Sequence, residues 1–287
     1  MINALEVPSD KDLSLFGRYL SQIGIQHRIH EEGDKLVVRV NTEADRDRVV
    51  ELYDLIETGE LQLEPAQHPG GKRPGEGVAS YALRYPLTLA LVIVNIVCFP
   101  AAFGIQDGEI TSWFHAMTFV AFEQGNGGVY FASLQYTLES GEYWRLLTPM
   151  FIHFSILHIV FNLLWVWEVG RRIELINGAS VLLLVVVTSS LGANFLQYSL
   201  SGPSLFGGMS GVVFGLLGYC FVWSRLVPQR AHGLPPGIYI FMAIFLVVGF
   251  TGAIDLLGMG TLANGAHLGG LLAGLVVGVV SSLLNRS

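Results

Sequence analysis

Apolar residues in this chain gather in six long runs that follow a more polar N-terminal region. The runs cover residues 86–105, 149–169, 179–200, 210–223, 237–254 and 263–284. A helix needs ~20 mostly apolar residues to cross the hydrocarbon core of a bilayer, and several of the runs reach that length. The pattern therefore predicts an all-α polytopic membrane domain of six transmembrane helices over residues 80–287.

The first 65 residues follow a different pattern, in which short segments with alternating polarity are interrupted by helix-like segments. Strands are predicted at residues 4–7, 26–30 and 35–40, and helices at residues 9–23 and 42–58. Their order predicts a small α/β domain of βαββα topology over residues 1–65. Residues 66–79, which include a stretch rich in Pro and Gly, are predicted to be a linker.

Composition and charge support this division. The chain of 287 residues is 52% hydrophobic and 14% charged, which is unlike an ordinary soluble protein. The formal net charge of -7 arises in the N-terminal domain, which holds 14 of the 23 acidic residues but only seven of the 16 basic ones. The N-terminus lacks the basic and apolar pattern of a signal peptide, so this domain is expected to stay in the cytosol.

Basic residues predict the orientation of the membrane domain, because they gather on the cytosolic side. If the N-terminus is cytosolic, Arg145 is the only basic residue of the membrane domain that is expected on the outer side. The inner flanks then hold Lys72, Arg73, Arg84, Arg171, Arg172, Arg225, Arg230 and Arg286. We therefore expect both termini in the cytosol, and residues 106–148 on the outer side.

Ser210 lies where a helix-breaking stretch meets an apolar run. Residues 201–208 read SGPSLFGG, whereas residues 210–223 are compatible with a helix. Free N–H groups and the dipole at a helix N-terminus favour developing negative charge. Taken alone, the stretch also fits an ordinary N-cap serine. At ~1.5 Å per residue, the run spans ~21 Å of a ~30 Å hydrocarbon core. Ser210 is then expected ~9 Å below the outer surface, in a water-filled cavity.

Polar residues in two other apolar runs are candidate partners of Ser210. His158 and Asn162 are four residues apart and share a helix face, and a helix length of ~20 Å to Arg171 gives His158 about the depth of Ser210. His267 lies in the last run, where small residues match the small residues after Ser210 and permit close helix packing. His153 comes five residues before His158 and is therefore expected nearer the outer surface. A structural role is expected for it in preference to a chemical one.

These side chains predict serine-protease chemistry. His267 is the candidate base for Ser210, while His158 and Asn162 are candidate oxyanion donors. No acid is placed to complete a triad, since Asp255 is expected in an outer loop and Glu168 and Glu174 near the inner face. The arrangement is therefore predicted to be a Ser–His dyad.

The spacing of these residues resembles the rhomboid family of intramembrane serine proteases. The matching motifs are His153-x4-His158-x3-Asn162, Gly208-x-Ser210-Gly211, Ala266-His267-x2-Gly270-x3-Gly274 and the pair Trp144-Arg145. Residues 80–287 fit the six-helix bacterial core, and the preceding domain is similar to that of GlpG-type bacterial rhomboids.

The resemblance implies cleavage of transmembrane protein substrates in the bacterial inner membrane, among membrane lipids, without cofactor, metal or nucleic acid. It implies Ser210 as nucleophile, His267 as base, and His158 with Asn162 in the oxyanion hole. Structural support is implied for His153, Trp144, Arg145, Gly208, Gly211, Gly270 and Gly274. Phe214 departs from the tyrosine common in related enzymes, and keeps the ring but not the hydroxyl.

Two other functions are considered. A catalytically inactive rhomboid-like protein would bind membrane helices without cleaving them, and a metal transporter would use His153, His158 and His267. The inner half of the bundle lacks the continuous polar path that a carrier needs. Residues 237–254 are rich in large apolar side chains, which fits either a lateral gate or lipid-facing packing.

Overall fold

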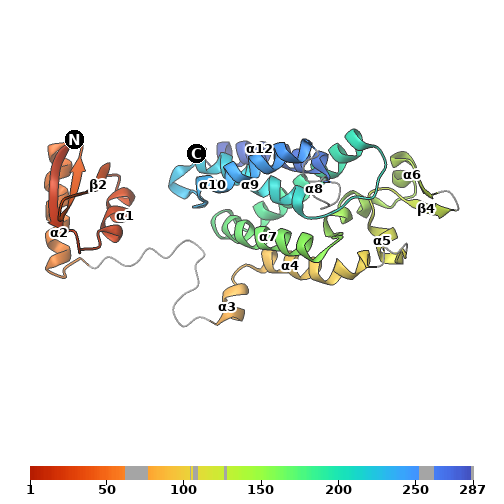
Figure 1. The fold of residues 1–287 in the computed structure, drawn as a ribbon, viewed down its shortest axis with the longest axis horizontal. Coiled ribbons are helices and arrows are strands. Elements are labelled where there is room, and N and C mark those ends of the chain that lie inside the picture. Colours follow the sequence, from red (N-terminus) through yellow and green to blue (C-terminus); the bar gives the residue numbers. More distant parts are fainter. Residues whose placement is uncertain (62–76, 104, 106–108, 126–127, 252–261, 286–287) are drawn as a thin grey trace. The chain divides into compact units, whose positions relative to one another are not determined.

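The computed structural model describes all residues except 62–76, 104, 106–108, 126–127, 252–261 and 286–287 (Figure 1). Contacts between residues divide the chain into two compact units, Met1–His68 and Pro69–Ser287. The predicted linker falls largely outside the described residues, and the short helix α3 (Val78–Ala82) begins within the range predicted for it.

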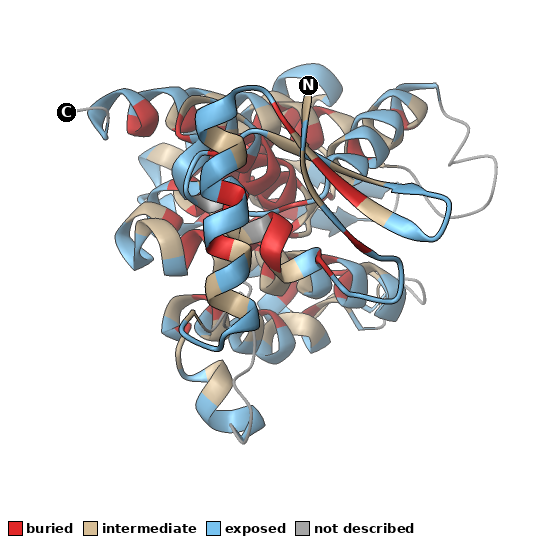
Figure 2. Ribbon diagram, turned by 90° about the vertical axis from the view of Figure 1, so that its left-hand side faces the viewer, coloured by how far each residue is buried: buried red, intermediate tan, exposed pale blue. Residues whose placement is uncertain are grey.

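The N-terminal unit has the predicted βαββα order. Its elements are β1 (Ile2–Pro8), α1 (Ser14–Gln22), β2 (His27–Glu32), β3 (Lys35–Val40) and α2 (Glu43–Glu57). The strands form an antiparallel sheet in the order β1-β3-β2. Buried and exposed residues alternate along these elements (Figure 2), and the apolar core includes Phe16, Leu20, Val38 and Val49.

One helix boundary in this unit differs from the prediction. Helix α1 begins at Ser14 instead of residue 9. Residues 9 and 10 form a turn, and the carboxylate of Asp12 accepts a hydrogen bond from the backbone N–H of Ser14 at 2.8 Å. Helix α2 begins as predicted, with Thr42 as its N-cap accepting from the N–H of Asp45.

The second unit is mostly helical. Its long helices are α4 (Pro86–Cys98), α7 (Ile156–Asn177), α8 (Ala179–Ser201), α9 (Ser210–Leu226), α10 (Pro236–Phe250) and α12 (Asn264–Leu284). The connection between α4 and α7 contains α5 (Ser112–Met117), β4 (Phe122–Gly125), β5 (Gly128–Phe131), α6 (Leu134–Glu139) and the 3-10 turns η1 (Phe99–Ala102), η3 (Tyr143–Leu146) and η4 (Thr148–Phe151). The turn η5 (Pro228–Arg230) follows α9.

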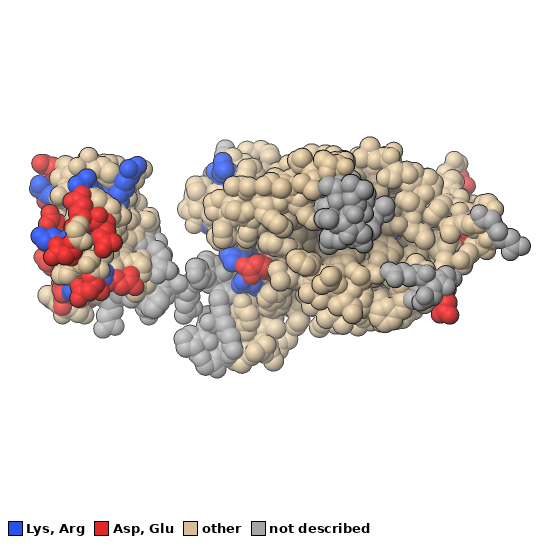
Figure 3. Space-filling model, viewed as in Figure 1, with Lys and Arg blue, Asp and Glu red and all other residues tan. Residues whose placement is uncertain are grey.

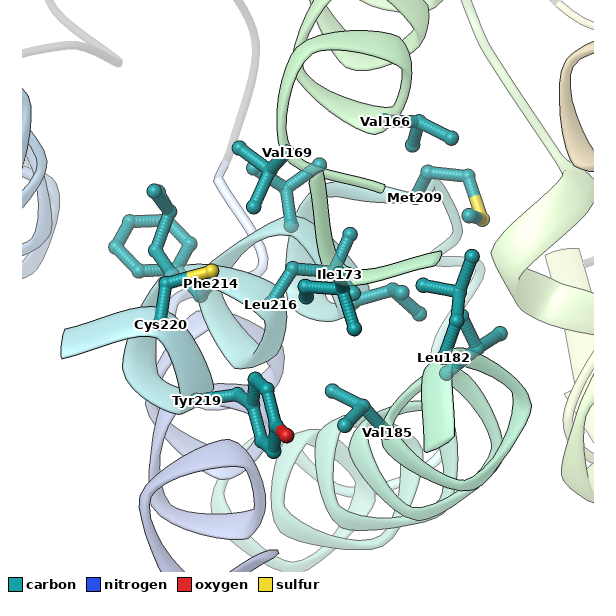
Figure 4. Close-up of a cluster of buried hydrophobic side chains, with 14 of the residues drawn as sticks. Val166, Val169, Ile173, Leu182, Val185, Met209, Phe214, Leu216, Tyr219 and Cys220 are labelled. Atoms are coloured by element: carbon teal, nitrogen blue, oxygen red, sulfur yellow. The ribbon is translucent and has the colours of Figure 1, made fainter. Parts of the chain in front are cut away.

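Helix α9 lies at the centre of this unit and is buried along most of its length. Side chains from α7, α8 and α9 meet in one apolar cluster (Figure 4). Ile173 of α7, Leu182 of α8 and Leu216 of α9 have no exposed surface. Because a helix buried on all sides is fixed by its neighbours, the residue that begins α9 has a well-defined position.

Three predicted helices in the helical unit have wrong boundaries. The first, predicted at 86–105, ends as α4 at Cys98 and continues as the 3-10 turn η1 to Ala102. The run predicted at 149–169 forms α7 at 156–177, because Pro149 lies in a 3-10 turn and Ser155 is the N-cap that accepts from the N–H of His158. Helix α9 has 17 residues and not 14, which at ~1.5 Å per residue is ~25 Å. The sequence-based depths of His158 and Ser210 therefore rested on helix ends that lie elsewhere.

Two helices among the described residues, α8 and α12, are both long and apolar enough to cross a membrane. Three shorter apolar helices cover Pro86–Ala102, Ser210–Leu226 and Pro236–Phe250. Helix α7 has 22 residues but carries four charged ones toward its C-terminal end. Length and apolarity therefore support a membrane protein, and do not by themselves give six spans.

Charged side chains are distributed unequally between the two units. Figure 3 shows acidic and basic groups crowded on the N-terminal unit, while the visible face of the helical unit is almost free of them. Large apolar side chains are exposed instead along its outer helices, such as Ile96 on α4, Phe161 on α7, Phe241 on α10 and Val276 on α12. A surface of this kind is suited to contact with lipid.

Candidate active site

Ser210 is the first residue of α9, and the residue before it makes its side chain available. Met209 is the N-cap, and no side chain caps the helix. The alternative that Ser210 is an N-cap serine is therefore wrong. Gly208 has φ 121°, in the left-handed region that favours glycine, and its N–H donates to the carbonyl of Pro149 at 2.9 Å.

His267 on α12 lies within hydrogen-bond distance of Ser210. Its Nε2 is 2.9 Å from the Ser210 Oγ, although the residues are 57 positions apart in the sequence. The imidazole is buried, and its Nδ1 has no hydrogen-bond partner among the described residues. With the ring proton on Nδ1, Nε2 accepts the hydroxyl hydrogen of Ser210, which is the arrangement that nucleophilic catalysis requires.

Aromatic rings hold the imidazole on two sides. Phe214, one turn after Ser210, stacks on His267 with ring centroids 4.8 Å apart and planes inclined by 28°. Phe245 of α10 approaches the same imidazole at 6.0 Å. The ring contact expected at position 214 is therefore present without a tyrosine hydroxyl.

Glycine contacts bring α9 and α12 close enough for this pair to form. A Cβ added to Gly270 would overlap the carbonyl oxygen of Gly211, and one added to Gly274 would overlap the carbonyl oxygen of Gly215. Helix α8 meets α12 in the same way, with Gly269 against the carbonyl of Gly192. The small-residue faces recognised in the sequence thus set the spacing of the helices that carry Ser210 and His267.

His158 and Asn162 lie beside the backbone that leads into Ser210. A Cβ on Gly208 would stand 2.6 Å from the His158 Nε2 and 3.7 Å from the Asn162 Nδ2. Both residues occupy the first two turns of α7, and the Asn162 Nδ2 donates to the carbonyl of His158 at 3.0 Å. Two side-chain nitrogens therefore point toward the glycine that comes two residues before Ser210.

His153 lies outside α7, in the irregular segment before it, and is buried. Its Nε2 accepts from the N–H of Met209 at 3.4 Å, while its Nδ1 is 3.3 Å from the carbonyl of Phe151. Its ring is 4.9 Å from that of His158. The contacts of His153 are therefore with the loop that positions Ser210, and not with the hydroxyl.

Trp144 and Arg145 join the end of the connection between α4 and α7 to its first α-helix, α5. The indole N–H of Trp144 donates to the carbonyl of Ala116 at 3.0 Å. The buried guanidinium of Arg145 donates to the carbonyls of His115 and Thr118, and pairs with the carboxylate of Glu142 at 2.7 Å. These bonds fix α5 against η3.

A small cavity next to Ser210 has room for about one water molecule. Polar groups from α8 reach it, since Asn194 and Ser190 both border the space. Its other lining residues include Met150, Phe206, Gly207, Gly208 and Ala266. The site can therefore hold a water close to the hydroxyl, although it is much smaller than the open wet cavity that the sequence predicts.

Of the three acids considered for a triad, the two that the structure describes are engaged elsewhere. Glu168 forms ion pairs with Arg171 and Arg172, and Glu174 accepts from the N–H groups at the start of α4. Asp255 lies outside the described residues.

Among the residues that the structure describes, no three His, Cys, Asp or Glu side chains form a group that could hold a metal ion.

Three contacts of the site were missed by the sequence analysis. Gln197 of α8 accepts from the N–H of Ala266, next to His267, at 3.1 Å. Asn264 begins α12 and bonds to α10, and Phe245 packs beside His267. The sequence indicates only that the amides of Gln197 and Asn264 need partners, because both lie in or beside membrane-spanning runs. It does not indicate which residues those partners are.

Comparison with known proteins agrees with this arrangement. The family model of the Rhomboid domain matches residues 140–283, and that of the Rhomboid N-terminal domain matches residues 1–67. The Rhomboid protease GlpG of Serratia proteamaculans (strain 568) is 30% identical over 290 aligned positions, which cover 96% of this chain and 95% of that protein. The chain belongs to the rhomboid family.

Proposed function

We propose that this protein is an intramembrane serine endopeptidase in which Ser210 and His267 form a catalytic dyad. The 2.9 Å contact between the Ser210 Oγ and the His267 Nε2 carries the proposal. The membership of the rhomboid family and the similarity to a rhomboid protease agree with it.

The reaction begins when Nε2 of His267 removes the hydroxyl proton and Oγ of Ser210 attacks the carbonyl carbon of the scissile peptide bond. The carbonyl oxygen becomes negative in the tetrahedral intermediate. His267 then transfers the proton to the leaving amine, and an acyl-enzyme ester remains on Ser210. Water, deprotonated by the same imidazole, hydrolyses the ester and restores the serine.

His158, Asn162 and the N–H of Ser210 stabilise the oxyanion. Their proximity to Gly208 supports this role, as does the position of Ser210 at a helix N-terminus, where N–H groups lack intrahelical partners. His153, Trp144 and Arg145 support the loops around the site, while Gly208, Gly211, Gly270 and Gly274 permit the close backbone contacts.

The substrates are transmembrane segments of other proteins, which reach Ser210 from the surrounding lipid. The exposed apolar side chains along the outer helices support this environment. The protein crosses the bacterial inner membrane six times by α4, α7, α8, α9, α10 and α12, with both termini and the 1–65 domain in the cytosol. The positions of the basic residues support this orientation.

Replacing Ser210 by Ala tests the proposal. Purified wild-type protein should cleave a panel of single-span substrates in detergent, and Ser210→Ala should leave no cleavage above background. Ser199→Ala is the matched control, because Ser199 is exposed on α8 and, among the described residues, its hydroxyl donates to the carbonyl of Phe195 alone. Cleavage by Ser210→Ala at the wild-type rate would refute the assignment, and the absence of cleavage by the wild type would favour an inactive helix-binding protein.

A further inference from the structure

A hydrogen bond joins the first residue of α12 to the last turn of α10. The Asn264 Nδ2 donates to the carbonyl oxygen of Gly249 at 2.8 Å. The two helices are so close here that a Cβ added to Gly249 would overlap the Asn264 Oδ1. That Oδ1 is buried and has no partner in the described part of the chain.

This bond brings a side-chain donor to a carbonyl in the last turn of α10. The last four carbonyls of an α-helix lack the regular intrahelical donor. Gly249 is the next-to-last residue of α10, where the N–H of the C-cap Thr251 points to the carbonyls of both Gly249 and Val248. Gly249 is buried, and a buried carbonyl needs partners from the protein. Asn264 therefore caps the C-terminal end of α10 from a neighbouring helix.

One helical turn away, the same two helices meet at the active site. Phe245 precedes Gly249 by four residues, and His267 follows Asn264 by three. The Phe245 ring lies 6.0 Å from the His267 ring and 6.5 Å from that of Phe214. The imidazole is thus held by one ring from α9 and another from α10.

Apart from this bond, the described side chains at the C-terminal end of α10 make mostly apolar contacts. Its side chains there are largely exposed and apolar, and include Ile244, Val247 and Phe250. The opposite end of the helix is held separately, where Tyr239 packs on Phe221 with ring centroids 5.4 Å apart. The Asn264 amide is therefore a directional contact one helical turn from Phe245.

We propose that Asn264 is a positioning residue for the dyad, which caps α10 and thereby keeps Phe245 against His267. This inference rests on the proposed function of Ser210 and His267. Since no acid among the described residues contacts the His267 Nδ1, the imidazole depends on its ring neighbours for orientation, and the amide of Asn264 fixes one of them.

The test measures both chemistry and stability. Asn264→Leu removes the donor at similar volume. A general base contributes ~10²–10⁴-fold to rate, and partial loss of its orientation should lower kcat for a single-span substrate by about tenfold, with little change in KM. The rate at which a small fluorophosphonate labels Ser210 should fall by a similar factor, at a temperature where thermal unfolding shows the variant folded.

A double-mutant cycle isolates the contact. Gly249→Ala introduces a methyl group that meets the Asn264 side chain, so it should slow labelling in the wild-type background. In the Asn264→Ala background the obstacle is gone, and adding Gly249→Ala should have little further effect. Val247→Ala, on the exposed face of the same helix, is the control and should leave the rate unchanged.

Several outcomes would overturn the inference. Wild-type labelling rates in folded Asn264→Leu, or additive effects in the cycle, contradict a positioning role. Faster cleavage of the transmembrane substrate with unchanged labelling would assign α10 to substrate entry instead. If Asn264→Leu does not fold, Phe245→Ala decides, since it removes the ring directly and must slow labelling. If the wild-type protein neither cleaves the substrate nor reacts with the fluorophosphonate, the proposed function is refuted. That result is distinct from a failure of the Asn264 inference alone.

Discussion

The imidazole of His158 lies directly against the backbone of Gly208, so that a single added methyl group at position 208 would stand 2.6 Å from its Nε2. This contact connects α7 to the loop before Ser210. It places a candidate oxyanion donor and the nucleophile on two sides of the same peptide segment.

Gly208→Ala is therefore expected to abolish most activity while leaving the helices in place. The substitution forces an L-residue into a φ of 121°, which costs about 1–2 kcal/mol, and pushes His158 out of position. Loss of one oxyanion donor lowers kcat by about 10²–10³-fold, and a loss of that size is expected in a cleavage assay.

Gly237→Ala is the matched control for this substitution. Gly237 lies in the first turn of α10 with open space around its Cα, so an added methyl group should leave cleavage near the wild-type rate. Near-wild-type activity of Gly208→Ala would show that the His158 contact does not matter for the reaction.

Activity should survive replacement of Phe214 by another aromatic residue, but not by a residue without a ring. Its stacking on His267 at 4.8 Å is retained by tyrosine and lost in alanine, so Phe214→Tyr should keep kcat within about twofold and Phe214→Ala should lower it by about tenfold or more. Steady-state kinetics on one substrate, with thermal unfolding as a check on folding, measures both. Equal loss in the two variants would mean that the ring itself is not what orients the imidazole.

Arg145 should contribute to stability more than to chemistry. Its guanidinium is buried and bonds to two carbonyls and one carboxylate. Alanine would leave these acceptors without donors, at about 1–3 kcal/mol for each that stays buried. We expect a clear drop in the thermal unfolding temperature of Arg145→Ala, and a smaller one for Arg145→Lys, which keeps the charge but not the planar set of donors. An unchanged unfolding temperature in Arg145→Ala would contradict this role.

The N-terminal domain offers a prediction about pH. A hydrogen bond from Lys11 at 2.7 Å holds the pKa of the Glu57 carboxyl below its ordinary value of 4.5. Because the folded-state pKa is lowered, the stabilisation is present above about pH 4.5 and is lost as the pH falls through the folded value. Lys11→Met should therefore destabilise this domain slightly at pH 6, and the difference should vanish near pH 3. The pair lies on the surface, so the effect is small. A difference in stability that grows toward low pH would contradict the assignment.

The sequence predicted some parts of this molecule better than others, for physical reasons. Local signals fixed the start of α9 and of α2, where Gly208 and Thr42 mark a change in backbone conformation. The small residues of α9 and α12 indicated which helices approach each other, and the structure brings Ser210 and His267 within 2.9 Å. Hydropathy alone misplaced α7, because the apolar residues before Ser155 continue the run without being helical.

Contacts between distant segments could not be derived from the sequence. The bond from Asn264 to Gly249 and that from Gln197 to Ala266 depend on how three helices meet at the site. Helix periodicity gives the face on which a side chain lies, but not the neighbour it will touch. For the same reason, the small size of the cavity beside Ser210 could not be predicted from the depth of a helix end.

Labelling of the wild type and of His267→Ala with a fluorophosphonate tests the central claim most directly. Mass spectrometry should locate the adduct on Ser210 in the wild type, and His267→Ala should label at least 100-fold more slowly, since a general base contributes about 10²–10⁴-fold. Equal labelling of the two proteins, or an adduct on any other residue, would contradict the account that His267 activates Ser210.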